Sequence, residues 1–276
     1  MNDGVRGSFE VNGRTLSYLD FGGPGPVLIA LHGHFSEGAD FAPLAQRLGS
    51  QWRVLALDQR GHGESDRATG YERSGYVGDV AAFLDHLGLA DVALLGHSLG
   101  GVNAYQFAAR HPDRVTALIV EDIGAVCDID LNFAKNLPDR VTTRDGLVEA
   151  VGAAAPYLER TFRERAEGWS FSFDAGDTVR SQQALSGDHW RDWLSVRCPT
   201  LLVRGTRSDE LSAWHARDMA AKRSIDLIEL TAGHVVHHDQ PDAFAECVRR
   251  FLAAVDGTAN SQLSGAVARL VVAMRG

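Results

Sequence analysis

Residues 92–100 read VALLGHSLG, and this stretch decides which fold the rest of the chain can adopt. An apolar run typical of a buried strand ends in GHSLG (96–100), and AYQFAARH, with the periodicity of a helix, follows it. Small residues around Ser98 permit a tight turn between strand and helix, where a larger side chain would collide with backbone. This pattern predicts that the Ser98 hydroxyl stands at the carboxyl end of a strand as a nucleophile. An ordinary tight turn is the alternative.

Outward from this turn, short apolar runs alternate with segments of helical periodicity. After an opening hairpin formed by SFEV and TLSYLDFG, strands are predicted at 27–31, 53–58, 92–96, 117–120, 200–205 and 226–230. Helices are predicted at 40–49, 76–87, 99–111, 212–222 and 241–254. Strands that alternate with helices indicate an α/β fold with a mostly parallel sheet, here of eight strands, flanked by helices.

One segment, residues 124–196, interrupts this alternation. It is rich in aromatic residues and has helical periodicity only in short pieces, so we expect a helical lid over the carboxyl edge of the sheet. The predicted organisation is a core formed by 1–123 and 197–256, the lid at 124–196, and a C-terminal extension at 257–276. The extension could form a short amphipathic helix that packs on the body or on a neighbouring chain.

The composition is that of an ordinary globular protein. The chain has 276 residues, of which 45 % are hydrophobic and 23 % charged, and its formal net charge is −9. An acidic balance argues against a nucleic-acid partner. No apolar run is long enough to span a membrane, and the N-terminus lacks the pattern of a signal peptide, so we expect a cytoplasmic protein. The sequence leaves the oligomeric state open, a homodimer included.

No metal or cofactor site is predicted. The three cysteines show no CxxC pairing, and the histidine-containing segments GHGES and HVVHHD lack an HExxH arrangement. The glycine-rich turn also lacks the lysine of a phosphate-binding loop.

Four segments, in order, resemble the α/β-hydrolase family, and the resemblance runs from about residue 8 to residue 255. Besides GHSLGG, they are HGH (32–34) after the first long strand, DQRGHGESD (58–66), and AGHVVHHDQP (232–241). The resemblance implies an α/β-hydrolase fold and a catalytic triad in the order serine, acid, histidine.

The positions of His234 and two acidic groups suggest the rest of that triad. His234 lies on the loop between the last predicted strand and the final helix, where the family keeps its base; among the 11 histidines it is preferred to His237 and His238. Asp209, four residues after a strand-end glycine, is the favoured acid, with its neighbour Glu210 as a substitute if the loop is shifted.

The sequence leaves a second candidate for the acid of the triad. Asp122, or its neighbour Glu121, follows the strand before the insertion, a site that some family members use instead. The competing interpretation makes Asp122 a structural cap at the entrance to the insertion.

The family resemblance also implies an oxyanion hole, which binds the negatively charged oxygen of the intermediate. The resemblance assigns it to the backbone N–H groups of His34 and Leu99. Phe35, His97, Trp169 and Phe133 are candidate substrate-binding residues, although His97 also fits a structural role within the turn, and most insertion aromatics are expected to form the core of the lid itself.

The predicted function is a serine-dependent hydrolase that cleaves an ester, lactone or similarly activated carbonyl compound through an acyl-enzyme. Its partner would be a small, largely apolar carbonyl-containing substrate. Alternatives are a cofactor-free oxygenase or perhydrolase of the same fold, a C–C bond hydrolase, or, less favoured, a non-catalytic protein that binds a small ligand.

Overall fold

A single eight-stranded sheet organises the computed structural model, which describes residues 3–257. The strand order is β1-β2-β4-β3-β5-β6-β11-β12. The strands are β1 Val5–Val11, β2 Arg14–Asp20, β3 Val27–Leu31, β4 Arg53–Leu57, β5 Val92–His97, β6 Val115–Glu121, β11 Thr200–Gly205 and β12 Asp226–Leu230. β1 and β2 join by antiparallel pairing and the rest of the sheet is parallel.

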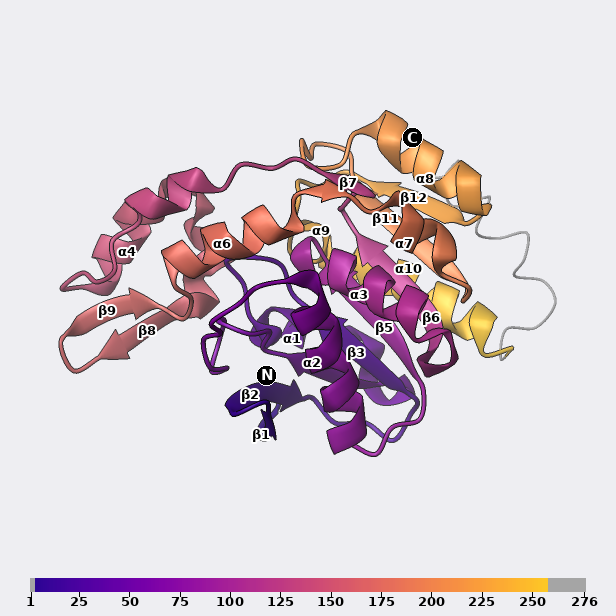
Figure 1. Cartoon of the computed structure of the whole chain (residues 1–276), viewed down its shortest axis with the longest axis horizontal. Coiled ribbons are helices and arrows are strands. Elements are labelled where there is room, and N and C mark those ends of the chain that lie inside the picture. Colours follow the sequence, from indigo (N-terminus) through magenta and orange to yellow (C-terminus); the bar gives the residue numbers. More distant parts are fainter. Residues whose placement is uncertain (1–2, 258–276) are drawn as a thin grey trace.

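Helices cover both faces of the sheet (Figure 1). They are α1 Ala42–Leu48, α2 Arg73–His86, α3 Leu99–Arg110, α8 Ala213–Arg223, α9 Val236–Asp239 and α10 Pro241–Val255. Alternate residues of a strand point to opposite faces, so Leu94 packs with α2, α3 and α8, whereas Leu95 packs with α1 and α10. The two apolar layers explain why the parallel strands are apolar on both faces.

Part of the insertion between β6 and β11 forms an arm to one side of the sheet, and its last helix lies beside α3 (Figure 1). It contains the helices α4 Arg144–Val151, α5 Ala155–Leu158, α6 Ala175–Leu185 and α7 Trp190–Ser195, and the short strands β7 Val126–Cys127, β8 Phe162–Arg165, β9 Gly168–Phe171 and β10 Gly187–Asp188. Phe162, Phe171 and Phe173 pack with Leu147 and Leu158 in a small core of its own. This arrangement agrees with the expectation that most aromatic residues of the insertion serve packing.

The predicted α/β fold and its eight-stranded sheet are confirmed, with element ends shifted by a few residues. The insertion is not purely helical, because 162–171 forms an antiparallel hairpin in which Phe162 pairs with Phe171. A segment with charged and aromatic residues around a glycine turn is better suited to two short strands than to a helix. The predicted C-terminal helix lies outside the described residues.

Candidate active site

The turn at Ser98 joins the end of β5 to the start of α3. Ser98 has φ +52° and ψ −119°, a conformation that costs energy for a residue with a side chain. A Cβ on Gly96 would lie 2.1 Å from the Gly100 carbonyl oxygen, and one on Gly100 would lie 2.1 Å from the Leu31 carbonyl oxygen. Only glycine fits at both positions, which is why the sequence GHSLG produces this turn and leaves Ser98 at its apex.

His234 is held by Asp122, which directly follows β6. The His234 ring donates a hydrogen bond from Nδ1 to Asp122 Oδ2 at 2.8 Å. Asp122 is fully buried and accepts two further hydrogen bonds, from the Gly205 N–H at 2.8 Å and from the Ser208 hydroxyl. These donors fix the carboxylate and stabilise its charge, so that it can orient the imidazole and stabilise the imidazolium.

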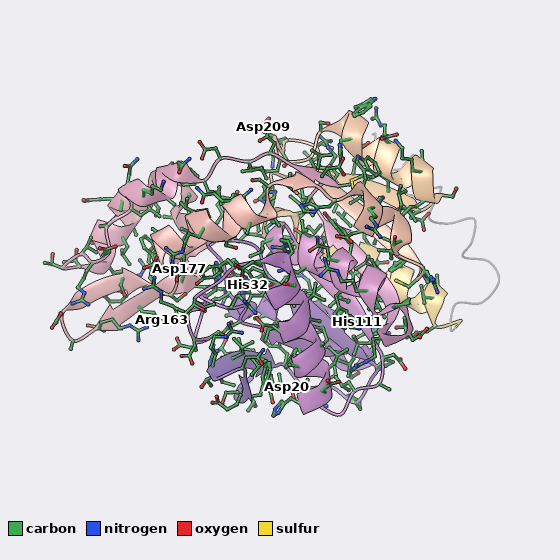
Figure 2. All side chains as sticks on the ribbon, viewed as in Figure 1. Asp20, His32, His111, Arg163, Asp177 and Asp209 are labelled. Atoms are coloured by element: carbon green, nitrogen blue, oxygen red, sulfur yellow. The ribbon has the colours of Figure 1, made fainter. Side chains whose placement is uncertain are left out.

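The preference for Asp209 over Asp122 as the partner of His234 is therefore wrong. Asp209 is exposed, and no hydrogen bond joins it to His234 among the described residues. Figure 2 shows it on the loop after β11, at the edge of the molecule. That loop contributes through Ser208, one residue earlier, which supports Asp122. Neither Glu210 nor Glu121 meets the His234 ring; the Glu210 backbone N–H donates to Ser208 Oγ.

His97 connects the turn at Ser98 to the loop that carries His234. Its Nε2 donates to the His234 carbonyl oxygen at 3.0 Å, and the two ring centroids lie 4.6 Å apart. Burial lowers the pKa of His97 to about 3, so its ring is neutral. Because His97 precedes Ser98, this contact places the His234 loop beside the turn, although no hydrogen bond joins Ser98 to His234 among residues 3–257.

A second histidine–carboxylate pair lies next to the first. Glu121 is fully buried and accepts hydrogen bonds at 2.9 Å from both the backbone N–H and the ring Nδ1 of His237. Although burial opposes both charges, the pair holds the pKa of His237 above and that of Glu121 below the ordinary value. The pairing could not be predicted from local sequence patterns, because it joins residues 116 positions apart.

A cavity of about 770 Å³ opens at these histidines. Its lining includes His97, His234 and His237 from the core, Phe35 from the loop after β3, and Tyr157 from the insertion. The cavity therefore lies between the carboxyl edge of the sheet and the insertion.

Two of the four predicted substrate-binding residues fall elsewhere. Phe35 and His97 line the cavity, whereas Trp169 and Phe133 are absent from its lining. Trp169 packs against the core of the insertion, and the exposed ring of Phe133 lies 5.7 Å from that of Phe35. Nothing in the sequence of the insertion distinguishes the aromatic residues that pack in its core from those that contact the cavity.

The predicted oxyanion donors lie on two segments near the turn. Among residues 3–257, the backbone N–H groups of His34 and Leu99 take part in no described backbone hydrogen bond. Leu99 is the first residue of α3, where an N–H has no acceptor within the helix. The loop after β3 is constrained as well, because Phe35 has φ +60° and the His34 ring contacts Ser181 of α6 at 2.9 Å.

The segments HGH and DQRGHGESD have structural roles in this arrangement. His32, labelled in the interior in Figure 2, accepts the Gln59 N–H at its Nε2 and donates from Nδ1 to the Gly33 carbonyl oxygen. Asp58 is fully buried and accepts the N–H groups of Gly38 and Glu64. These bonds tie the end of β4 to the loop that carries His34.

A family model described as the alpha/beta hydrolase family matches residues 27–247. The chain belongs to the alpha/beta hydrolase family. Its 2-(acetamidomethylene)succinate hydrolase relative from Mesorhizobium japonicum is 30 % identical over 83 % of this chain and 89 % of the relative. The sn-1-specific diacylglycerol lipase of Mus musculus is also 30 % identical, over 86 % of this chain and 85 % of the lipase.

Solved structures of α/β-hydrolases share this architecture. The crystal structure of E-2-(acetamidomethylene)succinate hydrolase superposes with a TM-score of 0.83, covering 90 % of this chain and 98 % of that chain at 24 % identity. Family membership and these relatives establish the protein as an enzyme of the hydrolase type. Within residues 3–257, no helix has both the length and the apolar character needed to cross a bilayer.

Proposed function

We propose that this α/β-hydrolase cleaves an ester, lactone or similarly activated carbonyl compound, with Ser98 as nucleophile, His234 as base and Asp122 as the acid that orients it. The observation that carries the proposal is the bond between His234 Nδ1 and Asp122, whose carboxylate is itself held by Gly205 and Ser208. With Nδ1 engaged, Nε2 is the ring nitrogen free to accept the Ser98 proton.

The reaction follows from these roles. As Ser98 Oγ attacks the carbonyl carbon, its proton passes to His234 Nε2, and the carbonyl oxygen becomes negatively charged. The N–H groups of His34 and Leu99 are the proposed donors to that oxygen. The imidazolium then protonates the leaving group, and an acyl-enzyme remains. A water molecule then attacks the acyl carbon while His234 takes one of its protons. The bond between the acyl carbon and Ser98 Oγ breaks, the carboxylic acid is released, and His234 returns the proton to Ser98.

Two relatives suggest a substrate with an acidic group. One hydrolase relative acts, by its name, on 2-(acetamidomethylene)succinate, and another relative is named a putative 2-succinyl-6-hydroxy-2,4-cyclohexadiene-1-carboxylate synthase, from Bacillus subtilis. A small carbonyl compound of this kind is compatible with a cavity of about 770 Å³. The insertion would then act as the lid over the bound substrate.

Replacing the nucleophile tests the proposal. We expect Ser98→Ala to lower kcat/KM for 4-nitrophenyl esters by roughly 10⁴-fold or more, because no acyl-enzyme can form. The matched control is Ser195→Ala, which removes a hydroxyl from an exposed residue at the end of α7. Ester hydrolysis that persists in Ser98→Ala would contradict the serine mechanism and favour a reaction that does not pass through an acyl-enzyme.

A further inference from the structure

The ring of His34 lies between the cavity and two buried hydroxyl groups. His34 is half-buried and belongs to the lining of the cavity, together with His97 and His234. Its Nε2 lies 2.9 Å from Ser181 Oγ, in α6 of the insertion, and Ser181 Oγ lies 2.7 Å from the hydroxyl of Tyr76, in α2. Ser181 and Tyr76 are both buried. A chain of polar contacts therefore runs from the interior to the cavity and ends at the His34 ring.

The hydroxyl hydrogens of this chain find acceptors in one direction only. Neither hydroxyl has another hydrogen-bond partner among the described residues, and a buried O–H without an acceptor is costly. Any arrangement in which Nε2 donates to Ser181 leaves one of the two hydroxyl hydrogens without an acceptor. When Tyr76 donates to Ser181 and Ser181 donates to Nε2, both hydrogens are bonded. The chain therefore makes His34 Nε2 an acceptor.

The remaining ring hydrogen of His34 is on Nδ1. Burial holds the pKa of His34 well below its ordinary value, so the ring is neutral at pH 7. A neutral imidazole carries a single N–H, and the nitrogen that accepts a hydrogen bond is the one without it. Because Nε2 accepts from Ser181, Nδ1 is the donor.

This Nδ1–H has no acceptor within the part of the chain that the structure describes. The ring of His62 lies 6.0 Å away between centroids, but its Nδ1 is bonded to the Arg60 carbonyl oxygen and its Nε2 has no partner, so the two rings are not hydrogen-bonded. Nδ1 of His97 is a buried atom without a partner, whereas Nδ1 of His34 is not among the buried ones. Since His34 lines the cavity, its Nδ1–H is open to a molecule bound there.

We propose that the side chain of His34 determines specificity, and that its Nδ1–H donates a hydrogen bond to an oxygen on the carbon next to the reacting carbonyl of the substrate. The backbone N–H of the same residue is the proposed donor to the carbonyl oxygen, and only a few covalent bonds separate the two donors. An ether, hydroxyl or keto oxygen on the adjacent carbon is similarly close to the carbonyl oxygen, so one residue can bind both.

The proposal names a substrate class for the proposed function and rests on it. That class is an ester or lactone whose acyl group carries an oxygen at the α position. A few well-placed polar groups fix the orientation of a ligand in a mostly apolar cavity, and the His34 ring is held for this task by Ser181.

Two esters of equal length test the proposal. In 4-nitrophenyl methoxyacetate an ether oxygen replaces one methylene group of 4-nitrophenyl butanoate, next to the carbonyl carbon. Each kcat/KM is divided by the rate of uncatalysed hydrolysis of the same ester, which removes the difference in intrinsic reactivity. We expect the wild type to prefer the methoxyacetate, and His34→Phe to lower the ratio of the two values by about fivefold or more, as the loss of one hydrogen bond predicts.

Two further variants show whether the Nδ1–H itself is responsible. His34→Asn places an amide N–H at about the position of Nδ1 and should keep part of the ratio. His111→Phe makes the same chemical change as His34→Phe at the end of α3 away from Ser98, and should leave the ratio unchanged. Melting curves of the variants show whether they are folded.

The tautomer of His34 gives a readout without turnover. In long-range proton–nitrogen NMR spectra of protein labelled with ¹⁵N-histidine, we expect His34 to be protonated at Nδ1, its signals being those that are absent from His34→Phe. Ser181→Ala removes the donor to Nε2, so the preference for this tautomer should weaken.

The outcomes separate this proposal from the proposed function. Equal corrected kcat/KM for the two esters in the wild type, an unchanged ratio in His34→Phe, or protonation of His34 at Nε2 would overturn the role of the His34 side chain. Hydrolysis that persists in Ser98→Ala would instead overturn the serine mechanism.

Discussion

At the scale of single residues, backbone strain marks the site. Five residues other than glycine have positive φ among those described, and three of them are Phe35, Ser98 and Asp122. Such conformations persist only where the surrounding structure imposes them. These three residues follow β3, β5 and β6, so the strained positions lie at the carboxyl ends of neighbouring parallel strands. The remaining two, Asn12 and Ser224, occupy a hairpin turn and a helix end.

The choice between the two aspartates leads to the first prediction at this scale. We expect Asp122→Asn to lower kcat by roughly 10³- to 10⁴-fold, because an amide can stabilise neither the required tautomer nor the imidazolium. Asp209→Asn makes the same chemical change on an exposed loop and should leave kcat within about twofold, as exposed substitutions usually do. Steady-state kinetics on one activated ester measures both. A large loss in Asp209→Asn with none in Asp122→Asn would reverse the assignment.

At the scale of elements, three hydrogen-bonded contacts hold the segment between β12 and α9. The Gly233 N–H donates to Asp239 at 2.7 Å, the His234 carbonyl accepts from His97, and Glu121 accepts from His237. Glu121 is the last residue of β6 and directly precedes Asp122. Two consecutive residues at the end of β6 therefore act on the same loop: Asp122 holds the His234 imidazole, and Glu121 holds the backbone that follows it.

Glu121 should act as a positioning residue through this segment. Glu121→Gln removes the negative charge that faces the His237 ring and leaves one acceptor oxygen instead of two, so we expect the loop to shift. We expect kcat to fall about 10- to 100-fold, the effect of small misplacements of a catalytic group, while KM changes little. The control Glu246→Gln removes a carboxylate from the surface of α10, where it pairs with Arg249 and Arg250. A parallel loss of kcat in both variants would refute the positioning role.

At the scale of the whole molecule, polar contacts join the insertion to the core. Arg163 of β8 pairs with the buried Glu37 at 2.6 Å and with Glu64 at 2.9 Å. Asp177 of α6 accepts from Arg67 and Tyr71 at 2.6 and 2.7 Å. Figure 2 shows Arg163 and Asp177 on the side of the insertion that faces the core. These polar contacts act together with apolar ones, because Leu185 and Trp193 of the insertion are buried in the apolar layer that contains Leu94.

Glu37 makes stability depend on pH. Burial, opposed by Arg163, raises its pKa from 4.5 to about 7. Between these values the folded state keeps a proton that the unfolded state has released, so the free energy of unfolding falls as the pH rises from about 4.5 to about 7. The contribution is roughly 3 kcal/mol.

Glu37→Gln should flatten that dependence, because an amide does not titrate. Denaturant unfolding at pH 5, 6 and 7 measures the slope for the wild type and the variant. Glu164→Gln, which changes an exposed carboxylate in β8, is the control and should keep the slope of the wild type. Equal slopes in Glu37→Gln and the wild type would show that Glu37 does not carry the effect.

The sequence by itself determined the alternation of strands and helices and the turn at Ser98, because these depend on residues adjacent in the chain. Small residues at Gly96 and Gly100 produce the turn wherever the chain goes next. The same local patterns placed His234 on the loop after β12. They also carried the family resemblance, since its four motifs lie at strand ends.

Only the tertiary structure decided which carboxylate meets His234. β6 and β11 are neighbouring parallel strands in which Glu121 pairs with Val203, so acids after either strand end at the same edge of the sheet. Asp122 is selected by its positive φ and by donors from residues more than 80 positions away, Gly205 and Ser208. Local periodicity has no information about such contacts, because they form only when the sheet is assembled.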